Sequence, residues 1–423
     1  MTVQQQFATV RTEICGHPVT ELAKQFGSPT YFYDATTIRA RIEQLRQFDV
    51  IRFAQKANSN IAVLDLMRKN GVVLDAVSSG EVFRAETAGF KADSALEPHQ
   101  IVYTADIFDR AALDLVVEKN IHVNVGSPDM IQQLGERCPG AEITIRINPG
   151  FGHGHSAKTN TGGESSKHGV WHDQLEECIE LAGKHEVTVT GLHMHIGSGT
   201  DFEHLSQVCE AMQKTAMRVG ASIKTISAGG GLPTPYRETD VGLDVDRYFQ
   251  LWDKTRKELE AEFGHPVSLE IEPGRFLVAE SGFLVSEIRA IKKMGDNLFY
   301  LLDAGFNNLA RPILYGAYHP MSVAFSGEAT DQTQAVIVGG PLCESGDIFT
   351  QEEGGFVCSR ELPVASVGDF LVIECAGAYG YVMSSNYNSK PFAAEVLMDG
   401  GDIHLIRSRQ TPEDLIQGEV IPG

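Results

Sequence analysis

The chain has 423 residues, of which 42% are hydrophobic and 22% are charged, and its formal net charge is -21. A chain of this length usually exceeds one hydrophobic core, so we expect two domains. The excess of acidic residues argues against nucleic acid and anionic membranes as partners, because both polyanions require basic protein surface.

The seven cysteines are scattered, odd in number and without a CxxC pair. This pattern argues against a disulfide-stapled fold and a thiolate zinc site, and it fits reduced thiols in a cytosol. Residues 1–6 lack the basic start and apolar block of a signal peptide, and no apolar run is long enough to span a membrane. We therefore expect a cytoplasmic protein.

The first predicted strand covers residues 29–34, and strands and helices then alternate along the chain. We predict strands at 50–56, 71–78, 101–104, 121–126, 142–148, 187–196, 224–228 and 267–272. Helices are predicted near 59–69, 80–89, 106–118, 128–137, 174–184, 203–219 and 244–263. Eight strands separated by helices indicate a (β/α)8 barrel of the TIM type, although a doubly wound open sheet gives a similar alternation.

Polar residues at the strand ends favour the barrel over the open sheet. They are Lys56, Asp75, Thr104, Asn124, Arg146, His193 with His195, Gly229-Gly230-Gly231, and Glu272-Pro273-Gly274-Arg275. The carboxyl ends of all strands converge on one face of a barrel, whereas in an open sheet only the strands beside the switch point converge. We therefore expect these side chains to share one site.

The pattern changes after residue 275. Strand-like runs at 283–292, 297–303, 335–339, 369–375 and 393–407 are joined by turns with little helical periodicity. A short helix is predicted after Thr411, which can act as its N-cap, with Pro412 at the first helical position. We therefore expect residues 29–275 to form the barrel, and residues 1–28 plus 276–423 to form a mostly β domain.

Three of the strand ends point to one cofactor. Lys56 follows an apolar strand, the three glycines allow a backbone to approach a phosphate closely, and Glu272 supplies a carboxylate. Taken alone, each is weak, because most lysines and glutamates are surface residues and three glycines can be a simple turn. Together they match pyridoxal 5′-phosphate (PLP), whose aldehyde takes a lysine, whose phosphate takes N–H donors and whose ring nitrogen takes an acid.

The motifs also resemble, in order and over almost the whole chain, those of the diaminopimelate decarboxylase family, which has the alanine racemase-like fold of PLP enzymes. The matching motifs are Gln55-Lys56-Ala57-Asn58, His193-Met194-His195-Ile196-Gly197-Ser198, Gly229-Gly230-Gly231, Glu272-Pro273-Gly274-Arg275, Cys343-Glu344-Ser345 and Gly377-Ala378-Tyr379-Gly380. The resemblance implies removal of the D-centre carboxylate of meso-2,6-diaminopimelate to give L-lysine and CO2, the last step of lysine biosynthesis.

The resemblance implies a role for each cofactor-binding residue. Lys56 would hold PLP through its amine, Glu272 would keep the ring nitrogen protonated, and His195 would stack on the pyridine face. The other implied cofactor contacts are Ser198, Gly230, Gly231, Gly274, Arg275 and Tyr379. Binding must also set the scissile Cα–carboxylate bond perpendicular to the ring, because orientation selects decarboxylation over racemisation.

Substrate binding is implied for Arg275, Arg311, Tyr315, Glu344 and Tyr379. The distal amino-acid head of the substrate would offer its carboxylate to the arginines and its ammonium to the acid. Without the resemblance, Arg311 is expected on the surface.

Cys343 lies in a polar turn after an apolar run. In the resembling family the equivalent cysteine reaches into the neighbouring subunit's site and protonates the substrate carbon, which a thiol can do. The resemblance therefore implies a homodimer in which Cys343 and Glu344 complete the partner's site. Without it, a loop thiol with no role is the simpler interpretation.

Three alternatives stay open. A metal-dependent barrel hydrolase could use His193 and His195, two apart on a strand, with His153, His155 or His168. A racemase or a non-catalytic PLP protein of the same fold is the second. The third is a decarboxylase of D-ornithine, D-lysine or another basic amino acid, in which Arg311 would be dispensable.

Overall fold

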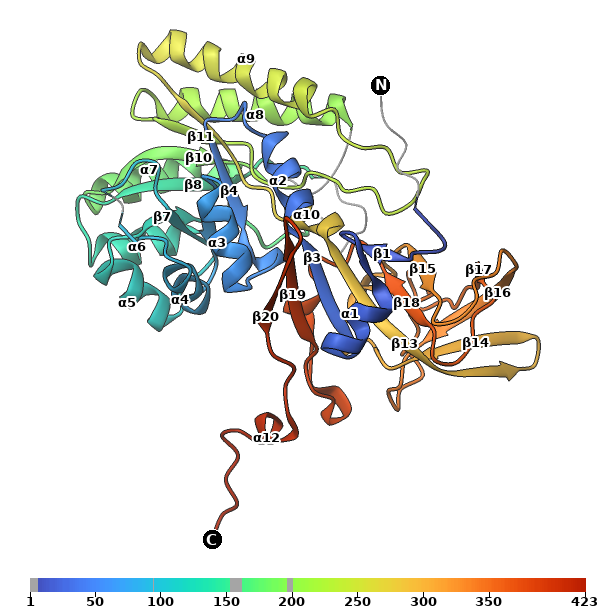
Figure 1. Cartoon of the computed structure of the whole chain (residues 1–423). Coiled ribbons are helices and arrows are strands. Elements are labelled where there is room, and N and C mark those ends of the chain that lie inside the picture. Colours follow the sequence, from blue (N-terminus) through green and yellow to red (C-terminus); the bar gives the residue numbers. More distant parts are fainter. Residues whose placement is uncertain (1–6, 94, 153–161, 196–200) are drawn as a thin grey trace. The chain divides into compact units, whose positions relative to one another are not determined.

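The computed structural model describes residues 7–93, 95–152, 162–195 and 201–423, which divide into two compact units (Figure 1). The barrel unit consists of the described residues of Ala40–Pro233 and Gly242–Leu277. The β unit consists of the described residues up to Arg39, together with Thr234–Val241 and Val278–Gly423. None of the described helices has both the length and the apolar character that a membrane crossing requires.

The barrel unit is built on a closed sheet of eight parallel strands. They are β4 (Val50–Ala54), β5 (Val73–Ala76), β6 (Ile101–Ala105), β7 (His122–Val125), β8 (Glu142–Asn148), β10 (Thr188–His193), β11 (Thr225–Ser227) and β12 (Ser268–Ile271). The ring closes because β12 pairs with β4 and β10 pairs with β8, and the short β9 (Val170–Trp171) pairs parallel with the end of β8. The predicted (β/α)8 barrel is confirmed.

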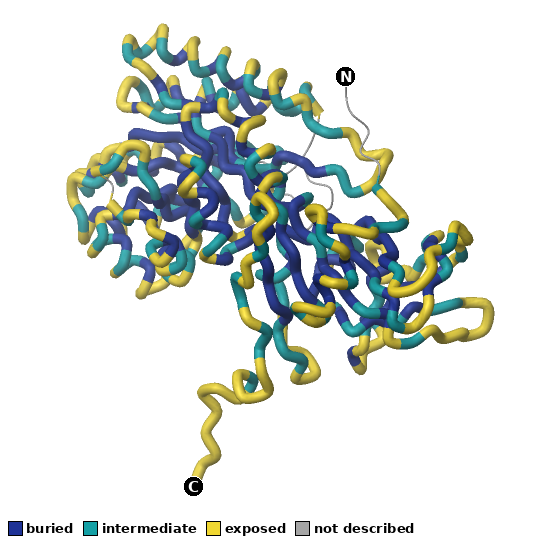
Figure 2. The backbone as a smooth tube through the Cα atoms, viewed as in Figure 1, coloured by how far each residue is buried: buried dark blue, intermediate teal, exposed yellow. Residues whose placement is uncertain are grey.

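Helices follow most of these strands. They are α3 (Ile61–Lys69), α4 (Ser79–Thr87), α5 (Arg110–Glu118), α6 (Pro128–Gly135), α7 (Leu175–Lys184), α8 (Phe202–Val219), α9 (Val245–Phe263) and α10 (Arg275–Val278), with α2 (Ala35–Glu43) before β4. Several start at a cap close after a strand: the side chains of Asn60, Ser78 and Asp109 accept hydrogen bonds from first-turn N–H groups. Figure 2 shows buried strands, with helices that alternate between buried and exposed, as amphipathic helices on a sheet should.

The β unit contains a seven-strand path in the order β17 (Arg360–Pro363), β16 (Thr333–Gly339), β14 (Asn297–Leu302), β13 (Gly282–Met294), β3 (Thr30–Asp34), β19 (Ala394–Asp399) and β20 (Asp402–Arg407). β18 (Phe370–Ile373) pairs with both β13 and β15 (Met321–Ala324). A two-stranded sheet, β1 (Glu13–Ile14) with β2 (His17–Pro18), precedes α1 (Val19–Phe26). The short helices α11 (Arg311–Tyr315) and α12 (Pro412–Leu415) lie in this unit, and α12 starts after Thr411 as predicted.

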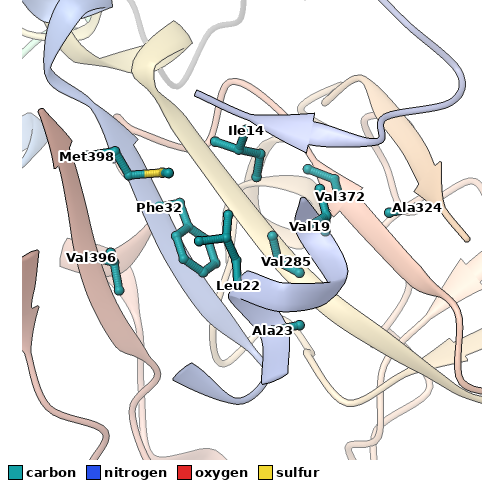
Figure 3. Packing of buried hydrophobic residues seen from close by; sticks show 10 residues of the cluster. All are labelled: Ile14, Val19, Leu22, Ala23, Phe32, Val285, Ala324, Val372, Val396 and Met398. Atoms are coloured by element: carbon teal, nitrogen blue, oxygen red, sulfur yellow. The ribbon is translucent and has the colours of Figure 1, made fainter. Parts of the chain in front are cut away.

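The core of the β unit forms where α1 lies on the sheet (Figure 3). Val19 and Leu22 of α1 pack with Phe32 of β3 and Val285 of β13, and all four side chains are almost fully buried. Apolar positions three residues apart face the same side of a helix, so α1 presents one apolar face to the sheet.

Two glycines bring backbone against backbone at the start of β13. An ideal Cβ at Gly282 would lie 2.1 Å from the N atom of Gly377, and one at Gly377 would lie 1.8 Å from the carbonyl O of Val278. No side chain fits at either position. The loop that carries Tyr379 therefore starts from a contact that only glycine permits.

The domain boundary differs from the expected one. Residues 30–34 were expected in the barrel domain, but β3 pairs antiparallel with β13 and parallel with β19, and the units divide between Arg39 and Ala40. The periodicity of this buried strand predicts a strand but cannot say which sheet it joins. The segment Thr234–Val241 also groups with the β unit, and β15, β17, α1 and α11 were not predicted.

Candidate active site

Lys56 lies on η1 (Gln55–Ala57), the short 3-10 turn that follows β4, and its side chain is exposed in this chain. The N–H of Ala54 donates a 3.1 Å hydrogen bond to the carbonyl O of Pro273. An ideal Cβ at Gly274 would lie only 3.3 Å from the Cβ of Ala54. The turn with Lys56 and the Glu-Pro-Gly-Arg turn are therefore packed together, as the strand-end argument predicts.

Glu272 is a buried carboxylate with two side-chain neighbours. The hydroxyl of Ser227 donates to its Oε1 at 2.9 Å, and Nε2 of His193 lies 2.9 Å from its Oε2. Burial alone would raise the pKa of Glu272, but the nearby charge of His193 outweighs burial and lowers this pKa well below its usual range. Glu272 is therefore an anion at neutral pH, able to bind a protonated ring nitrogen.

The positive charge of Lys56 affects the pKa values of two further acids, Asp75 and Glu81. Burial, followed by the charge of Glu272, raises the pKa of Asp75 to about 6, and the positive charge of Lys56 opposes this rise. Burial also raises the pKa of Glu81 to about 7, against a hydrogen bond from the Val77 N–H and the charge of Lys56. The exposed amine therefore faces an acidic end of the barrel.

His195 is held by the glycine segment. The N–H of Gly230 donates to Nδ1 of His195 at 2.7 Å, so this nitrogen carries no proton. Desolvation, followed by the charges of Arg146 and Lys56, lowers the pKa of His195 well below its usual value. An ideal Cβ at Gly230 would lie 2.4 Å from the carbonyl O of Glu272, so only glycine fits at position 230, between Glu272 and His195.

These residues fit PLP. The exposed Lys56 amine suits the aldehyde, and the buried anion of Glu272 suits a protonated ring nitrogen. Gly230 leaves no space for a side chain, because the Glu272 carbonyl O would lie 2.4 Å from its Cβ, and its N–H donates to His195. The phosphate contact expected of this glycine segment stays a prediction. Gly231 and Arg275, both half-buried, belong to the same barrel unit.

The predicted substrate residues on α11 lie in the β unit. Arg311 is only 7% exposed, which contradicts its placement on the surface by residue type alone. Its Nη1 donates to Nε2 of His319 at 2.7 Å, and its guanidinium carbon lies 4.8 Å from the ring centroid of Tyr236. Tyr315, the last residue of α11, is half-buried.

Cys343 and Glu344 are exposed on a turn after β16. The N–H of Cys343 donates to Oδ1 of Asn388 at 2.7 Å, and the hydroxyl of Tyr387 donates to Oε2 of Glu344 at 3.4 Å. Tyr379 is half-buried and has a φ of 56°, in the left-handed region that a tyrosine rarely adopts.

The histidines proposed as alternative metal ligands have separate partners. His193 contacts Glu272, His195 accepts from Gly230, and Nδ1 of His168 lies 2.7 Å from Oδ2 of Asp106. The described residues contain no group of three or more His, Cys, Asp or Glu arranged to hold a metal ion. The predicted residue Ser198, with His153 and His155, lies outside the described residues.

The sequence did not indicate the contacts that hold these groups. Ser227 was not predicted to have a role, although only Ala228 separates it from the predicted glycine segment. His193 was expected at the shared strand-end site, but the only individual role given to it was that of a possible metal ligand. No pattern near His319 indicated its contact with Arg311. All seven cysteines are free thiols in the structure.

Residues 36–279 match a protein family described as "Pyridoxal-dependent decarboxylase, pyridoxal binding domain". The diaminopimelate decarboxylase of Streptomyces coelicolor is 55% identical over 403 residues, which are 95% of this chain and 91% of the relative. The chain belongs to the diaminopimelate decarboxylase family. This membership confirms the resemblance, the PLP cofactor and the carboxy-lyase class that the motifs predict.

Solved structures agree with this assignment. A crystal structure of a diaminopimelate decarboxylase superposes with a TM-score of 0.91 at 51% identity, covering 94% of this chain and 95% of that one. A diaminopimelate decarboxylase from Helicobacter pylori complexed with L-lysine superposes with a TM-score of 0.84 at 30% identity, covering 94% of this chain and 98% of that one. The match extends through both units, so the β unit is part of the family's architecture.

Proposed function

We propose that this chain removes the carboxylate from the D-centre of meso-2,6-diaminopimelate and releases L-lysine and CO2. The observation that carries the proposal is the buried Glu272 anion, held by Ser227 and His193 beside the Lys56 turn, in a chain of this family. The Helicobacter pylori relative was solved with L-lysine, the product that the proposal requires.

PLP, when bound, supplies an electron sink for the electron pair that CO2 leaves behind. Lys56 would hold the cofactor through its amine, and Glu272 would hold a proton on the ring nitrogen, which keeps the sink effective. His195 would lie against the ring face, with Gly230 and Gly231 at the phosphate. Ser198, Gly274, Arg275 and Tyr379 are proposed as further cofactor contacts.

The β unit would supply substrate binding and the final proton. Arg311, with Arg275, would bind the distal carboxylate, because a planar guanidinium pairs with a carboxylate through two parallel hydrogen bonds. Glu344 would bind the distal ammonium, and Tyr315 and Tyr379 would line the same site. The Cys343 thiol would donate the proton to the carbon that lost CO2.

The exposure of Cys343 and Glu344 supports a homodimer in which these two residues complete the site of the partner subunit. A catalytic thiol that stands on an exposed turn of its own chain needs a second surface to exclude water from the reaction. The expected cytoplasmic location remains a prediction.

A substrate screen tests the reaction. The holoenzyme is offered meso-diaminopimelate, D-lysine, D-ornithine and several L-amino acids, and CO2 release is measured. We expect meso-diaminopimelate to have the highest kcat/KM. A preference for D-lysine or D-ornithine, which lack the distal carboxylate, would support the alternative decarboxylase and overturn the proposed role of Arg311.

A further inference from the structure

Arg311 is oriented by a histidine. The side chain of Arg311 is 7% exposed and His319 is fully buried, and the hydrogen bond from Nη1 to Nε2 is 2.7 Å long. A guanidinium can only donate hydrogen bonds, so Nε2 of His319 must be the acceptor and must carry no proton.

The backbone fixes the other imidazole nitrogen. Nδ1 of His319 lies 2.9 Å from the carbonyl O of Glu374. A carbonyl oxygen can only accept, so Nδ1 carries the proton. The two neighbours of His319 therefore both select the same neutral tautomer, with one nitrogen donating to Glu374 and the other accepting from Arg311.

The carbonyl that holds His319 is itself well anchored. The N–H of Glu374 donates to the carbonyl O of Pro320 at 2.9 Å. Its carboxylate accepts from the hydroxyl of Ser322 at 2.9 Å and from Arg11 at 2.9 and 3.0 Å. The imidazole is thereby tied to β15 and β18, which are paired strands of the sheet.

An aromatic ring defines the remaining orientation. The guanidinium carbon of Arg311 lies 4.8 Å from the centroid of the Tyr236 ring, and the Tyr236 and His319 rings meet edge to face at 77° with centroids 5.3 Å apart. His319 thus bonds one edge of the planar guanidinium, and the Tyr236 ring covers one of its faces. Fixing an edge and a face of this rigid fork fixes the direction of its remaining donors.

The partner on this edge is neutral. A carboxylate in the place of His319 would also hold the guanidinium, but it would cancel much of the positive charge that attracts an anionic ligand. A neutral imidazole orients Arg311 without itself cancelling the positive charge of the guanidinium.

We propose that His319 is a positioning residue that directs the Arg311 guanidinium at the distal carboxylate of the substrate. The proposal rests on the function proposed above, in which Arg311 binds that carboxylate. His319 thereby contributes to the choice of diaminopimelate over basic amino acids that lack this group.

Steady-state kinetics of four holoenzyme variants tests the proposal. His319→Asn keeps a donor near the Glu374 carbonyl but is too short to reach Arg311, whereas His319→Gln places an acceptor near the position of Nε2. We expect His319→Asn to raise KM for meso-diaminopimelate by about tenfold to a hundredfold, the scale of a lost hydrogen bond to a charged group. Its kcat should stay within about twofold, because the bond serves binding rather than the chemical step, and His319→Gln should restore most of the KM.

Arg311→Gln separates a failure of the proposed substrate role of Arg311 from a failure of the positioning role of His319. If Arg311→Gln leaves KM unchanged, the proposed function has misplaced the substrate arginine. If Arg311→Gln raises KM but both folded His319 variants keep the wild-type KM, only the positioning role is wrong. The positioning role would also be overturned if His319→Asn and His319→Gln lowered kcat and raised KM to the same extent and both reduced the PLP absorbance. That result would indicate that His319 has a structural role alone. The double variant Arg311→Gln/His319→Asn should have the KM of Arg311→Gln.

Discussion

The carboxyl end of the barrel and the exposed turn of the β unit hold their functional groups in opposite ways. In the barrel, Glu272 is buried and contacted by both Ser227 and His193. On the turn, Cys343 and Glu344 are exposed, and the contact to Glu344 is a long 3.4 Å hydrogen bond from Tyr387.

The difference indicates which part of the site one chain can organise alone. Buried polar groups that bond to one another are preorganised, because moving any of them leaves the others unsatisfied. Exposed groups are held mainly by water until another surface covers them. We therefore expect changes in the barrel to act on PLP binding, and changes at the exposed turn to act on turnover.

The largest expected effect comes from the barrel. Lys56→Ala removes the amine that we expect to hold PLP, so activity should fall by at least about 10³-fold, the scale of removing a covalent catalyst. The near-visible absorbance of bound PLP should disappear with it. Lys254→Ala, a change at an exposed lysine of α9, is the matched control. Turnover without bound PLP would contradict the assignment.

The next effect tests the exposed turn. Cys343→Ala should lower kcat by about 10²- to 10⁴-fold, the usual contribution of a general acid, while PLP absorbance stays unchanged. Cys15→Ala, which changes another exposed thiol, should leave kcat alone. An undiminished rate for Cys343→Ala would remove its proposed role.

Mixing the Lys56→Ala and Cys343→Ala proteins tests whether the exposed turn of one subunit completes the barrel site of the other. If Cys343 acts in the partner's site, a dimer of one Lys56→Ala and one Cys343→Ala subunit contains one intact site. Random reassociation should then restore roughly a quarter of wild-type activity. No recovery, with subunit exchange verified, would show that each chain completes its own site.

A smaller effect on PLP binding is expected from changing His193, which contacts Glu272. His193→Leu leaves the carboxylate buried without its imidazole, so burial would dominate and raise the pKa of Glu272. PLP affinity should therefore fall more at pH 6 than at pH 8, because a carboxyl group with a raised pKa is protonated to a greater extent at the lower pH. Breaking a buried pair also lowers the free energy of unfolding by about 3–5 kcal/mol. Dialysis against PLP at both pH values and thermal melts measure these effects, and equal losses of affinity at both pH values would contradict this account.

The smallest effect concerns Asp75. Its pKa of about 6 lies above the ordinary value of 3.8, so the stability it contributes is present at low pH and is lost as pH rises through about 6. No described atom donates a hydrogen bond to its Oδ1. Asp75→Asn should therefore stabilise the PLP-free protein at pH 8 by up to roughly 3 kcal/mol, by about half as much at pH 5, and by little below pH 4. A pH-independent difference in thermal melts would disprove the shift.

The barrel could be predicted because its signals are local and repeated. Each strand ends in a polar residue, and closure of a parallel sheet brings such ends together without further information. This is why the turns of Lys56 and Glu272 could be placed side by side from the sequence.

The β unit could be predicted only in outline. Its strand β3 pairs with β13 and β19, segments about 250 and 360 residues away, and periodicity carries no information on such partners. Arg311 was expected on the surface because arginines usually are, and its burial depends on His319 and Tyr236, which no motif connects to it. The sequence could not specify contacts between distant residues, and its periodicity also missed the short elements β15, β17, α1 and α11.

The glycine contact at the start of β13 has a consequence for mutational scans of this protein. Gly282 and Gly377 leave no space for even a methyl group, so every substitution there should score as severely as a change at Lys56. A scan that records growth alone would then rank these two positions with the catalytic lysine. Abundance measured in parallel would separate them, because the glycine variants should lose the protein itself, whereas a Lys56 variant should accumulate and remain inactive.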